Sequence, residues 1–178
     1  LPSGGREKFG ITTGRDPDPP PSAEGRALDR ATIARGLAWC ARHGITLVDL
    51  ALKSRAPPTT ADLRAMRDVL KNVEYPILLH CKSGADRAGI MSVIVRHERD
   101  GLPIEEAKKQ LSLRYGHIRS ADTGVLDAVF ERYLADRAKT GIEFWDWVET
   151  VYDPEELRRS FKARGWANRL TDGLLHRE

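Results

Sequence analysis

Hydrophobic and polar positions along the chain follow two periods, one typical of helices and one typical of strands. Apolar residues at helical spacing predict helices over 28–43, 61–72, 87–100, 104–115, 122–139, 143–151 and 154–164. Shorter apolar or alternating runs predict strands over 45–52 and 77–80, the second of them a central strand. Strands that alternate with helices indicate an α/β fold, in which a central, mainly parallel sheet is flanked by helices.

Residues that stop or cap helices support these bounds. Gly44 ends the first predicted helix, Thr59 and Thr60 cap the second, and the Gly-Leu-Pro run at 101–103 ends the third. One inward face of the first helix is expected to hold Ile33, Leu37 and Cys40. The inward face of the helix over 122–139 is expected to hold Leu126, Val129, Phe130, Tyr133 and Leu134.

The N-terminal 26 residues differ from the rest. They are rich in Gly, Pro and charge, and the Pro-rich run at 16–21 is compatible with neither a helix nor a central strand. We therefore expect residues 1–26 to form an extended, poorly packed arm, in which only Lys8–Thr12 has strand character. The first residue is not Met, so the N-terminus is expected to be truncated or processed. Residues 27–178 are expected to form one domain.

Composition narrows the classes of function. With 178 residues, 40% of them hydrophobic, the chain is long enough to bury one core, and it contains no apolar run long enough to cross a membrane. The net charge of +3 suits either an ordinary solvated surface or a phosphorylated or anionic-lipid substrate. No basic run is interleaved with aromatic residues, so a nucleic-acid partner is not expected. The sequence does not indicate an oligomeric state.

The two cysteines, Cys40 and Cys81, are not spaced as metal ligands, and the histidines do not complete a site with them. We therefore expect neither a metal nor a cofactor. Cys40 is expected to be a core thiol on a helix, although it could also resolve an oxidised Cys81. A structural disulfide would consume the thiol of Cys81, so we expect a reducing, cytoplasmic compartment.

Cys81 and Arg87 are the residues with the clearest chemistry. Cys81 directly follows a predicted strand. Five residues separate it from Arg87, which begins a predicted helix. A loop that leads into a helix N-terminus aims backbone N–H groups at one point, where an anion can bind. That field favours the thiolate of Cys81, a strong nucleophile, and the fork of Arg87 can hold two phosphate oxygens. His80, just before the cysteine, could orient the loop.

The run from His80 to Gly89, His-Cys-Lys-Ser-Gly-Ala-Asp-Arg-Ala-Gly, resembles the signature loop of the cysteine-based protein tyrosine phosphatase superfamily. It is most similar to the compact dual-specificity-like branch found in bacteria. The likeness extends from about Leu28 to about Tyr152, including the Gln-Leu-Ser-Leu-Arg-Tyr-Gly-His run at 110–117. The resemblance implies a tyrosine phosphatase-like fold, with Cys81 as nucleophile and Arg87 as phosphate clamp. It also implies a phosphate-binding loop formed by Lys82, Ser83, Gly84, Ala85, Ala88 and Gly89.

The general acid has two candidates. Related phosphatases place an aspartate on a separate upstream loop, and Asp49 suits that spacing, but it lies within a predicted strand. The loop at 53–58, where the acid would be expected, has no carboxylate. We favour Asp86, inside the loop, because some relatives, the myotubularin-like phosphatases among them, carry an aspartate there. Purely structural roles are the alternatives: Asp86 could hold Arg87 or the loop, and Asp49 could pair with an arginine.

Three further positions bear on turnover and substrate. Relatives often have Ser or Thr where this chain has Ala88, so hydrolysis of the phosphocysteine is expected to be slow. A lysine at the position of Lys82 occurs in relatives that act on phosphorylated inositol lipids. Asp122 could position the hydrolytic water or cap a helix, and His117 and Arg119 could line the rim of the pocket.

These features predict a hydrolase: a phosphomonoesterase that works through a phosphocysteine intermediate, of the tyrosine or dual-specificity phosphatase type. Its substrates would be phosphorylated proteins, phospholipids or inositol phosphates. The alternative is a phosphate-binding module that does not hydrolyse its ligand, which the alanine at position 88 and the unassigned acid would suit.

Overall fold

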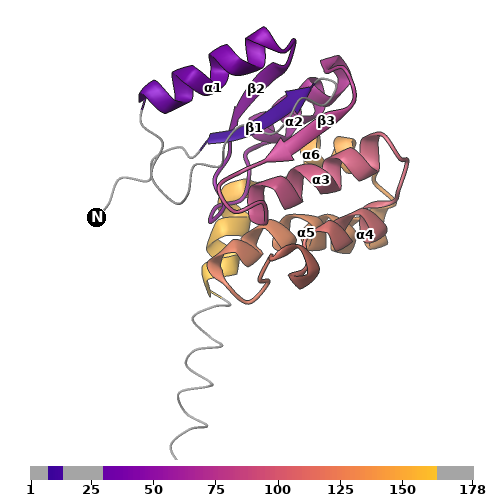
Figure 1. Cartoon of the computed structure of the whole chain (residues 1–178). Coiled ribbons are helices and arrows are strands. Elements are labelled where there is room, and N and C mark those ends of the chain that lie inside the picture. The colour runs from indigo at the N-terminus through magenta and orange to yellow at the C-terminus, as the bar shows by residue number, and fades with distance from the viewer. Residues whose placement is uncertain (1–7, 14–29, 164–178) are drawn as a thin grey trace, which may run out of the picture.

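The computed structural model describes residues 8–13 and 30–163, and these residues form a small sheet and a larger helical body (Figure 1). The strands are β1 (Lys8–Thr13), β2 (Thr46–Ala51) and β3 (Ile77–His80). The α-helices are α1 (Arg30–Arg42), α2 (Thr60–Asn72), α3 (Asp86–Glu98), α4 (Ile104–Ala107), α5 (Val125–Thr140) and α6 (Phe144–Thr150). Short 3-10 turns are η1 (Lys108–Gln110), η2 (Leu113–Tyr115) and η3 (Asp122–Gly124), and residues 154–163 are also helical.

The expected central, mainly parallel sheet is wrong. The sheet has three strands in the order β2-β1-β3, and β1 is antiparallel to both of its neighbours. β2 and β3 run in the same direction, but β1 lies between them, so no parallel pair forms among the described strands. β3 is therefore an edge strand of this sheet rather than the central one. Most of the described chain is helical, and the sheet lies to one side of the helical body (Figure 1).

The middle strand comes from the segment that was expected to be an extended arm. β1 pairs with β2 from Lys8 opposite Ala51 to Thr13 opposite Thr46. On its other edge it pairs with β3, with Ile11 opposite Leu79. Residues 8–13 thus belong to the folded body, while the Pro-rich run lies outside the described residues.

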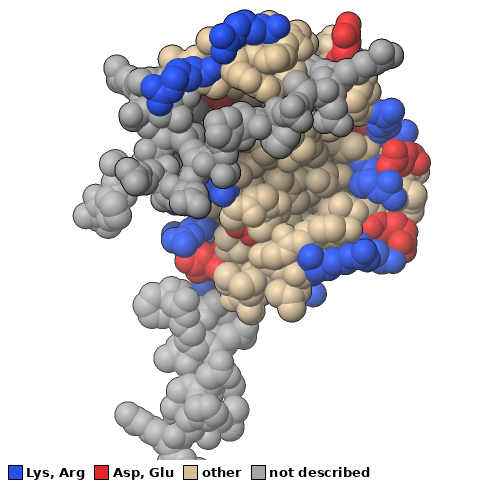
Figure 2. All heavy atoms as spheres, viewed as in Figure 1, with Lys and Arg blue, Asp and Glu red and all other residues tan. Residues whose placement is uncertain are grey.

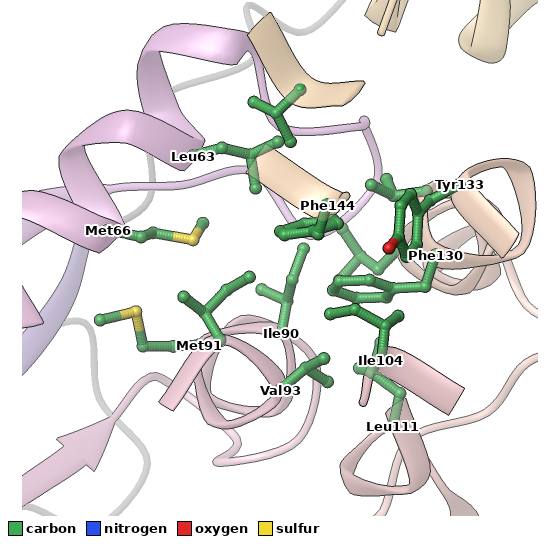
Figure 3. Close-up of a cluster of buried hydrophobic side chains, with 14 of the residues drawn as sticks. Leu63, Met66, Ile90, Met91, Val93, Ile104, Leu111, Phe130, Tyr133 and Phe144 are labelled. Atoms are coloured by element: carbon green, nitrogen blue, oxygen red, sulfur yellow. The ribbon is translucent and has the colours of Figure 1, made fainter. Parts of the chain in front are cut away.

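Two layers of helix enclose the sheet unequally. α1 contacts β2 on the outer side, and α2 and α3 contact β2 and β3 from the side of the helical body (Figure 1). The core lies among the helices, where Leu63 and Met66 of α2 meet Ile90 and Met91 of α3 and Phe130 of α5 (Figure 3). Phe144 of α6 closes the same cluster, with its ring centroid 5.1 Å from that of Tyr133. The core therefore fixes α3 on both sides.

The helix predictions over 61–72 and 87–100 are confirmed within about one turn by α2 and α3. Thr59 caps α2 as predicted, and Gly44, with a φ of +66°, follows α1. The prediction over 104–115 is wrong in its continuity, since the helix stops after α4 and resumes only as short turns.

The inward face predicted for α1 is also wrong in part. Although α1 contacts β2, Leu37 is 47% exposed and Cys40 is half-buried. The side chain of Ile33 lies outside the described residues. On α5 the prediction is confirmed for Leu126, Val129, Phe130 and Tyr133, which are buried, while Leu134 is half-buried.

Polar contacts join the helices at the surface. The indole of Trp145 donates to the carboxylate of Glu98, and the guanidinium of Arg67 lies 4.5 Å from the Trp145 ring centroid, so α2, α3 and α6 meet at one point. On the face shown in Figure 2, Lys and Arg side chains lie beside Asp and Glu around the edge rather than in one stripe. None of the described helices is long and apolar enough to cross a membrane.

Candidate active site

Cys81 lies directly after β3, where the edge strand leaves the sheet. Its side chain is half-buried and packs against the hydrophobic core, which limits the directions in which the thiol can point. Both described cysteines are free thiols. The loop that follows is exposed at Lys82, Ser83 and Gly84 and becomes buried at Ala85. Solvent therefore reaches the loop from the side opposite the core.

The loop ends at a helix start that no side chain caps. Ala85 is the N-cap residue of α3 and makes no side-chain capping bond. The first intrahelical bond runs from the N–H of Gly89 to the carbonyl of Ala85, at 2.8 Å. The N–H groups before Gly89 in the first turn have no acceptor within the helix. Together with the positive end of the helix dipole they favour an anion at this point.

Two glycines allow this close geometry. Gly84 has a φ of +71°, a left-handed conformation that residues with a Cβ adopt at a cost. Gly89 lies in the first turn of α3, and a Cβ there would come within 2.8 Å of Leu111 Cδ2. The first turn can therefore pack directly against the segment after η1.

The buried polar side chains concentrate at this site. Among the described residues, Arg87 at 4% exposure and His117 at 1% are the buried polar or charged side chains. Arg87 is the second residue of α3, directly after the exposed loop and Ala85 and Asp86. The planar fork of a guanidinium can hold two oxygens of a phosphate, so a guanidinium at this helix start suits phosphate recognition.

Asp86 does not stand alone beside Arg87. Nδ1 of His117 lies 2.7 Å from Oδ1 of Asp86, and Nε2 of the same ring lies 2.6 Å from Oδ2 of Asp127 on α5. The imidazole is fully enclosed, with a side-chain exposure of 0%. The expectation that His117 lines the rim is therefore wrong, because its ring is wedged between two carboxylates inside the protein.

Asp49, the other candidate acid, lies on the strand as the hydrophobic pattern predicts. It is an exposed residue of β2, opposite Gly10 of β1, and Gly10 is also opposite His80. Residues directly opposite each other in an antiparallel pair project from the same face, so Asp49 and His80 share a face with only a glycine between their strands. Desolvation by the surrounding protein lowers the pKa of His80, and the Asp49 carboxylate acts against that shift.

The loop where an upstream acid was expected is fixed in another way. Residues 53–58 carry no carboxylate, and the hydroxyl of Tyr152 donates to the carbonyl of Pro58 at 2.8 Å. Burial raises the pKa of Tyr152, which keeps this donor protonated. The loop is thereby tied to the segment that follows α6.

The remaining predicted residues have simpler surroundings. Ala88 is buried, and its carbonyl accepts a hydrogen bond from the Ser92 hydroxyl at 2.8 Å. Asp122 is exposed and opens η3, whose N-cap is Ala121, so capping of the following helix by Asp122 is wrong. Arg119 is exposed and pairs with Glu131 of α5. The described residues contain no group of His, Cys, Asp and Glu that could hold a metal ion.

Sequence reasoning missed Asp127, which a helical pattern could have indicated. It lies three residues before the buried Phe130, near the inward side of α5, and a carboxylate in such a position needs a partner. Its partner, His117, comes from a loop, and no local pattern predicts that contact.

Comparison with known proteins gives this chain no relatives: no protein-family model, no curated protein and no solved structure matches it.

Proposed function

We propose that this protein is a cysteine-dependent phosphomonoesterase that works through a phosphocysteine intermediate. The observation that carries the proposal is the order of parts around one helix start. A half-buried free thiol at Cys81 is followed by an exposed loop, an uncapped helix N-terminus and a buried guanidinium at Arg87. Each part has a separate role in phosphoryl transfer, and the resemblance of residues 80–89 to the phosphatase signature loop points the same way.

In the first step the Cys81 thiolate attacks the phosphorus atom of a bound phosphomonoester. An S–P bond forms, the P–O bond to the leaving group breaks, and the leaving oxygen takes a proton from a general acid. In the second step water attacks the phosphorus atom, the S–P bond breaks and restores the thiolate, and the carboxylate that gave up its proton in the first step takes a proton from the water as inorganic phosphate forms. Backbone N–H groups of the loop and the fork of Arg87 bind the phosphate oxygens throughout.

Asp86 is the acid that we favour, and its surroundings define how it would act. Its Oδ1 accepts a hydrogen bond from His117, so proton delivery falls to Oδ2. Because Asp49 is a strand residue on the opposite side of β1 from β3, it is the second candidate.

The substrates that we propose are phosphorylated proteins, or phospholipids and inositol phosphates. Lys82 is exposed in the loop, where its positive charge suits an anionic substrate such as an inositol phosphate or a phospholipid headgroup. A thiolate nucleophile works only when reduced, so the proposal places the protein in a reducing compartment such as the cytoplasm.

The test is a screen of phosphopeptides, inositol phosphates and phospholipids with the wild type and Cys81→Ser, each with and without EDTA. We expect the wild type to release phosphate in the presence of EDTA. We expect Cys81→Ser to lose at least about a thousandfold in rate, since a serine hydroxyl is not ionised near neutral pH. Binding of the best substrate to Cys81→Ser should remain within a few-fold of the wild type.

Two outcomes would redirect the proposal. Near wild-type activity of Cys81→Ser, or activity that EDTA removes and a divalent ion restores, would indicate a different phosphatase chemistry. Binding of phosphate esters without release of phosphate in any assay would instead support the binding module.

A further inference from the structure

A single buried histidine joins three separate parts of the candidate site. Asp86 is the first residue of α3, Asp127 lies in the first turn of α5, and His117 comes from the loop between η2 and η3. Distances of 2.7 Å and 2.6 Å from the two ring nitrogens to the carboxylates are those of charge-assisted hydrogen bonds. The two carboxylate side chains are also largely enclosed, with exposures of 20% and 14%.

The geometry constrains the protons on the ring. Oδ1 of Asp86 accepts whether Asp86 is ionised or carries the acid's proton on Oδ2, and an ionised Asp127 only accepts, so both nitrogens of His117 have to donate for both contacts to form. The ring then carries a positive charge, and the three side chains together are one charge unit less negative than they would be with a neutral ring. That difference matters here because Asp86 adjoins Arg87 at the helix start where a phosphate would bind.

The loop that carries His117 is folded so that it can reach this position. Gly116 has a φ of +79°, and a Cβ there would lie 3.6 Å from Cβ of Ala85, at the end of the loop that follows Cys81. The N–H of His117 donates to the carbonyl of Ser112 at 3.1 Å. At the other end of the loop, a Cβ on Gly124 would lie 1.9 Å from the carbonyl oxygen of Arg119, so only glycine fits there.

We infer that His117 is a positioning residue of the candidate site. Through its two N–H groups it fixes the Asp86 carboxylate against α5, and its charge offsets that of Asp86 and Asp127 beside the bound oxyanion. The identity of that oxyanion as a phosphoryl group rests on the proposed function, whereas the hydrogen-bond geometry does not. His117 itself does not touch the substrate in this arrangement.

The experiment measures oxyanion affinity with tungstate by calorimetry, alongside kcat, KM and Tm. In His117→Gln the amide has its donors on a single nitrogen, so it cannot reproduce the two contacts made from separate ring nitrogens, and it carries no charge; we therefore expect tungstate affinity to fall at least about tenfold. In the double variant His117→Gln with Asp127→Asn the net charge of the three positions returns to its wild-type value. Affinity should then recover to within about threefold of the wild type. Equal loss of affinity in the single and double variants would contradict the charge role.

His97→Gln is the matched control. His97 lies in the last turn of the same helix, and its Nδ1 lies 2.8 Å from the carbonyl of Leu102. The same substitution there should lower Tm and leave tungstate affinity unchanged. A lower Tm without a change in tungstate affinity in His117→Gln as well would reduce His117 to a structural residue and overturn the inference.

A second measurement covers the case in which His117→Gln does not fold. Imidazole nitrogen-15 spectra of the wild type near neutral pH should show both nitrogens of His117 protonated. Asp86→Asn should shift the Nδ1 signal and Asp127→Asn the Nε2 signal. A ring with one unprotonated nitrogen would overturn the inference.

The two proposals fail in distinguishable ways, because tungstate binding and the spectra need no turnover. A wild type without phosphatase activity, but with affinity that depends on His117, would remove the proposed function alone. An active enzyme that is indifferent to His117→Gln would remove the positioning role alone.

Discussion

The N-termini of α2 and α3 have similar residues, but their hydrogen bonds differ, and so does what each N-terminus can bind. Both helices have 13 residues, and both carry an aspartate in the first turn. In α2, Thr59 accepts from the N–H of Asp62 at 3.1 Å, and the Asp62 carboxylate accepts from the N–H of Thr59 at 2.8 Å. In α3 the N-cap is Ala85, and the Asp86 carboxylate turns away to His117.

The difference lies in what the first-turn carboxylate accepts. Asp62 satisfies the backbone of its own helix, which completes the helix end and stabilises it. Asp86 bonds to another part of the chain, and the N-cap residue Ala85 makes no side-chain bond to the backbone donors of α3. An anion can then meet those donors, and the helix end gives up the stability that a cap would add. Substitutions at the two ends should therefore affect different quantities.

The largest expected effect is at the N-terminus of α3, which no side chain caps. Arg87→Lys should lower kcat/KM at least about a hundredfold, because an ammonium group cannot reproduce the two parallel bonds of a guanidinium fork. Steady-state kinetics with an aryl phosphate measures it, and a Tm scan checks that the buried substitution still folds. Arg99→Lys is the control, since that residue follows the other end of α3, with its guanidinium 3.6 Å from the Tyr75 ring centroid. Retention of more than about a tenth of the rate, or less than ~1.4 kcal/mol lost, would contradict the clamp.

The next effect separates the two acids. Asp86→Asn should slow hydrolysis of alkyl phosphates far more than that of aryl esters of acidic phenols, because only a basic leaving oxygen needs a proton in the transition state. Asp49→Asn should leave that ratio nearly unchanged. The measurement is kcat/KM over a series of leaving groups. The reverse pattern would assign the acid to the strand, and an unchanged ratio in both variants would leave Asp86 with the role of holding the loop.

These contacts also show how far the sequence alone could go. Helix α2 was predictable because its cap, Thr59, and the apolar spacing of Leu63, Met66 and Leu70 are local signals. The loop around Cys81 was predictable for the same reason. The strand order was not predictable. β1 pairs with segments far along the chain, and its six residues do not indicate which strands it pairs with or whether the pairing is parallel or antiparallel.

Other differences have similar causes. Residues 104–115 have a continuous helical pattern, yet Leu111 leaves helical geometry with a ψ of 84°, and it packs against Gly89 of α3. Tertiary packing overrides local propensity there. The contact of His117 with Asp127 joins a loop to a helix, and only the folded structure brings them together.

At the capped end we expect a moderate change in stability and none in catalysis. Thr59→Ala removes the capping bond to Asp62 and should lower the free energy of unfolding by about 1 kcal/mol. Urea denaturation measures the loss, and kcat/KM should stay at the wild-type value. Thr60→Ala, one residue further on, removes no capping bond and should stay within about 0.5 kcal/mol. A Thr59→Ala variant with lower activity and unchanged stability would break the contrast between the two helix ends.

The smallest effect concerns the pH dependence of stability and involves His80, the last residue of β3, the strand before the loop to α3. Because the pKa of His80 is lowered in the fold, the folded protein binds fewer protons than the unfolded chain below the ordinary value of 6.5. Stability should therefore decrease as the pH falls through that value toward the lowered one. His80→Asn should flatten this part of the stability curve, measured by urea denaturation between about pH 7.5 and pH 5. Asp49→Asn should steepen it, since the carboxylate opposes the shift; a curve unchanged in both variants would rule out this coupling.

The middle position of β1 has a consequence for the order of events during synthesis. β1 leaves the ribosome before either of its neighbours, and its partner at position 79 follows 68 residues after position 11. Until β3 emerges, the edge of β1 that it will cover has no described strand beside it, and an open strand edge invites pairing with another chain. The strand that brings Cys81 to the loop is thus the last to join the sheet. The nascent protein should be most prone to association before Cys81 has been made. Folding should be slow for a chain of this size, because the long segment between β1 and β3 has to close before their pairing can stabilise the sheet.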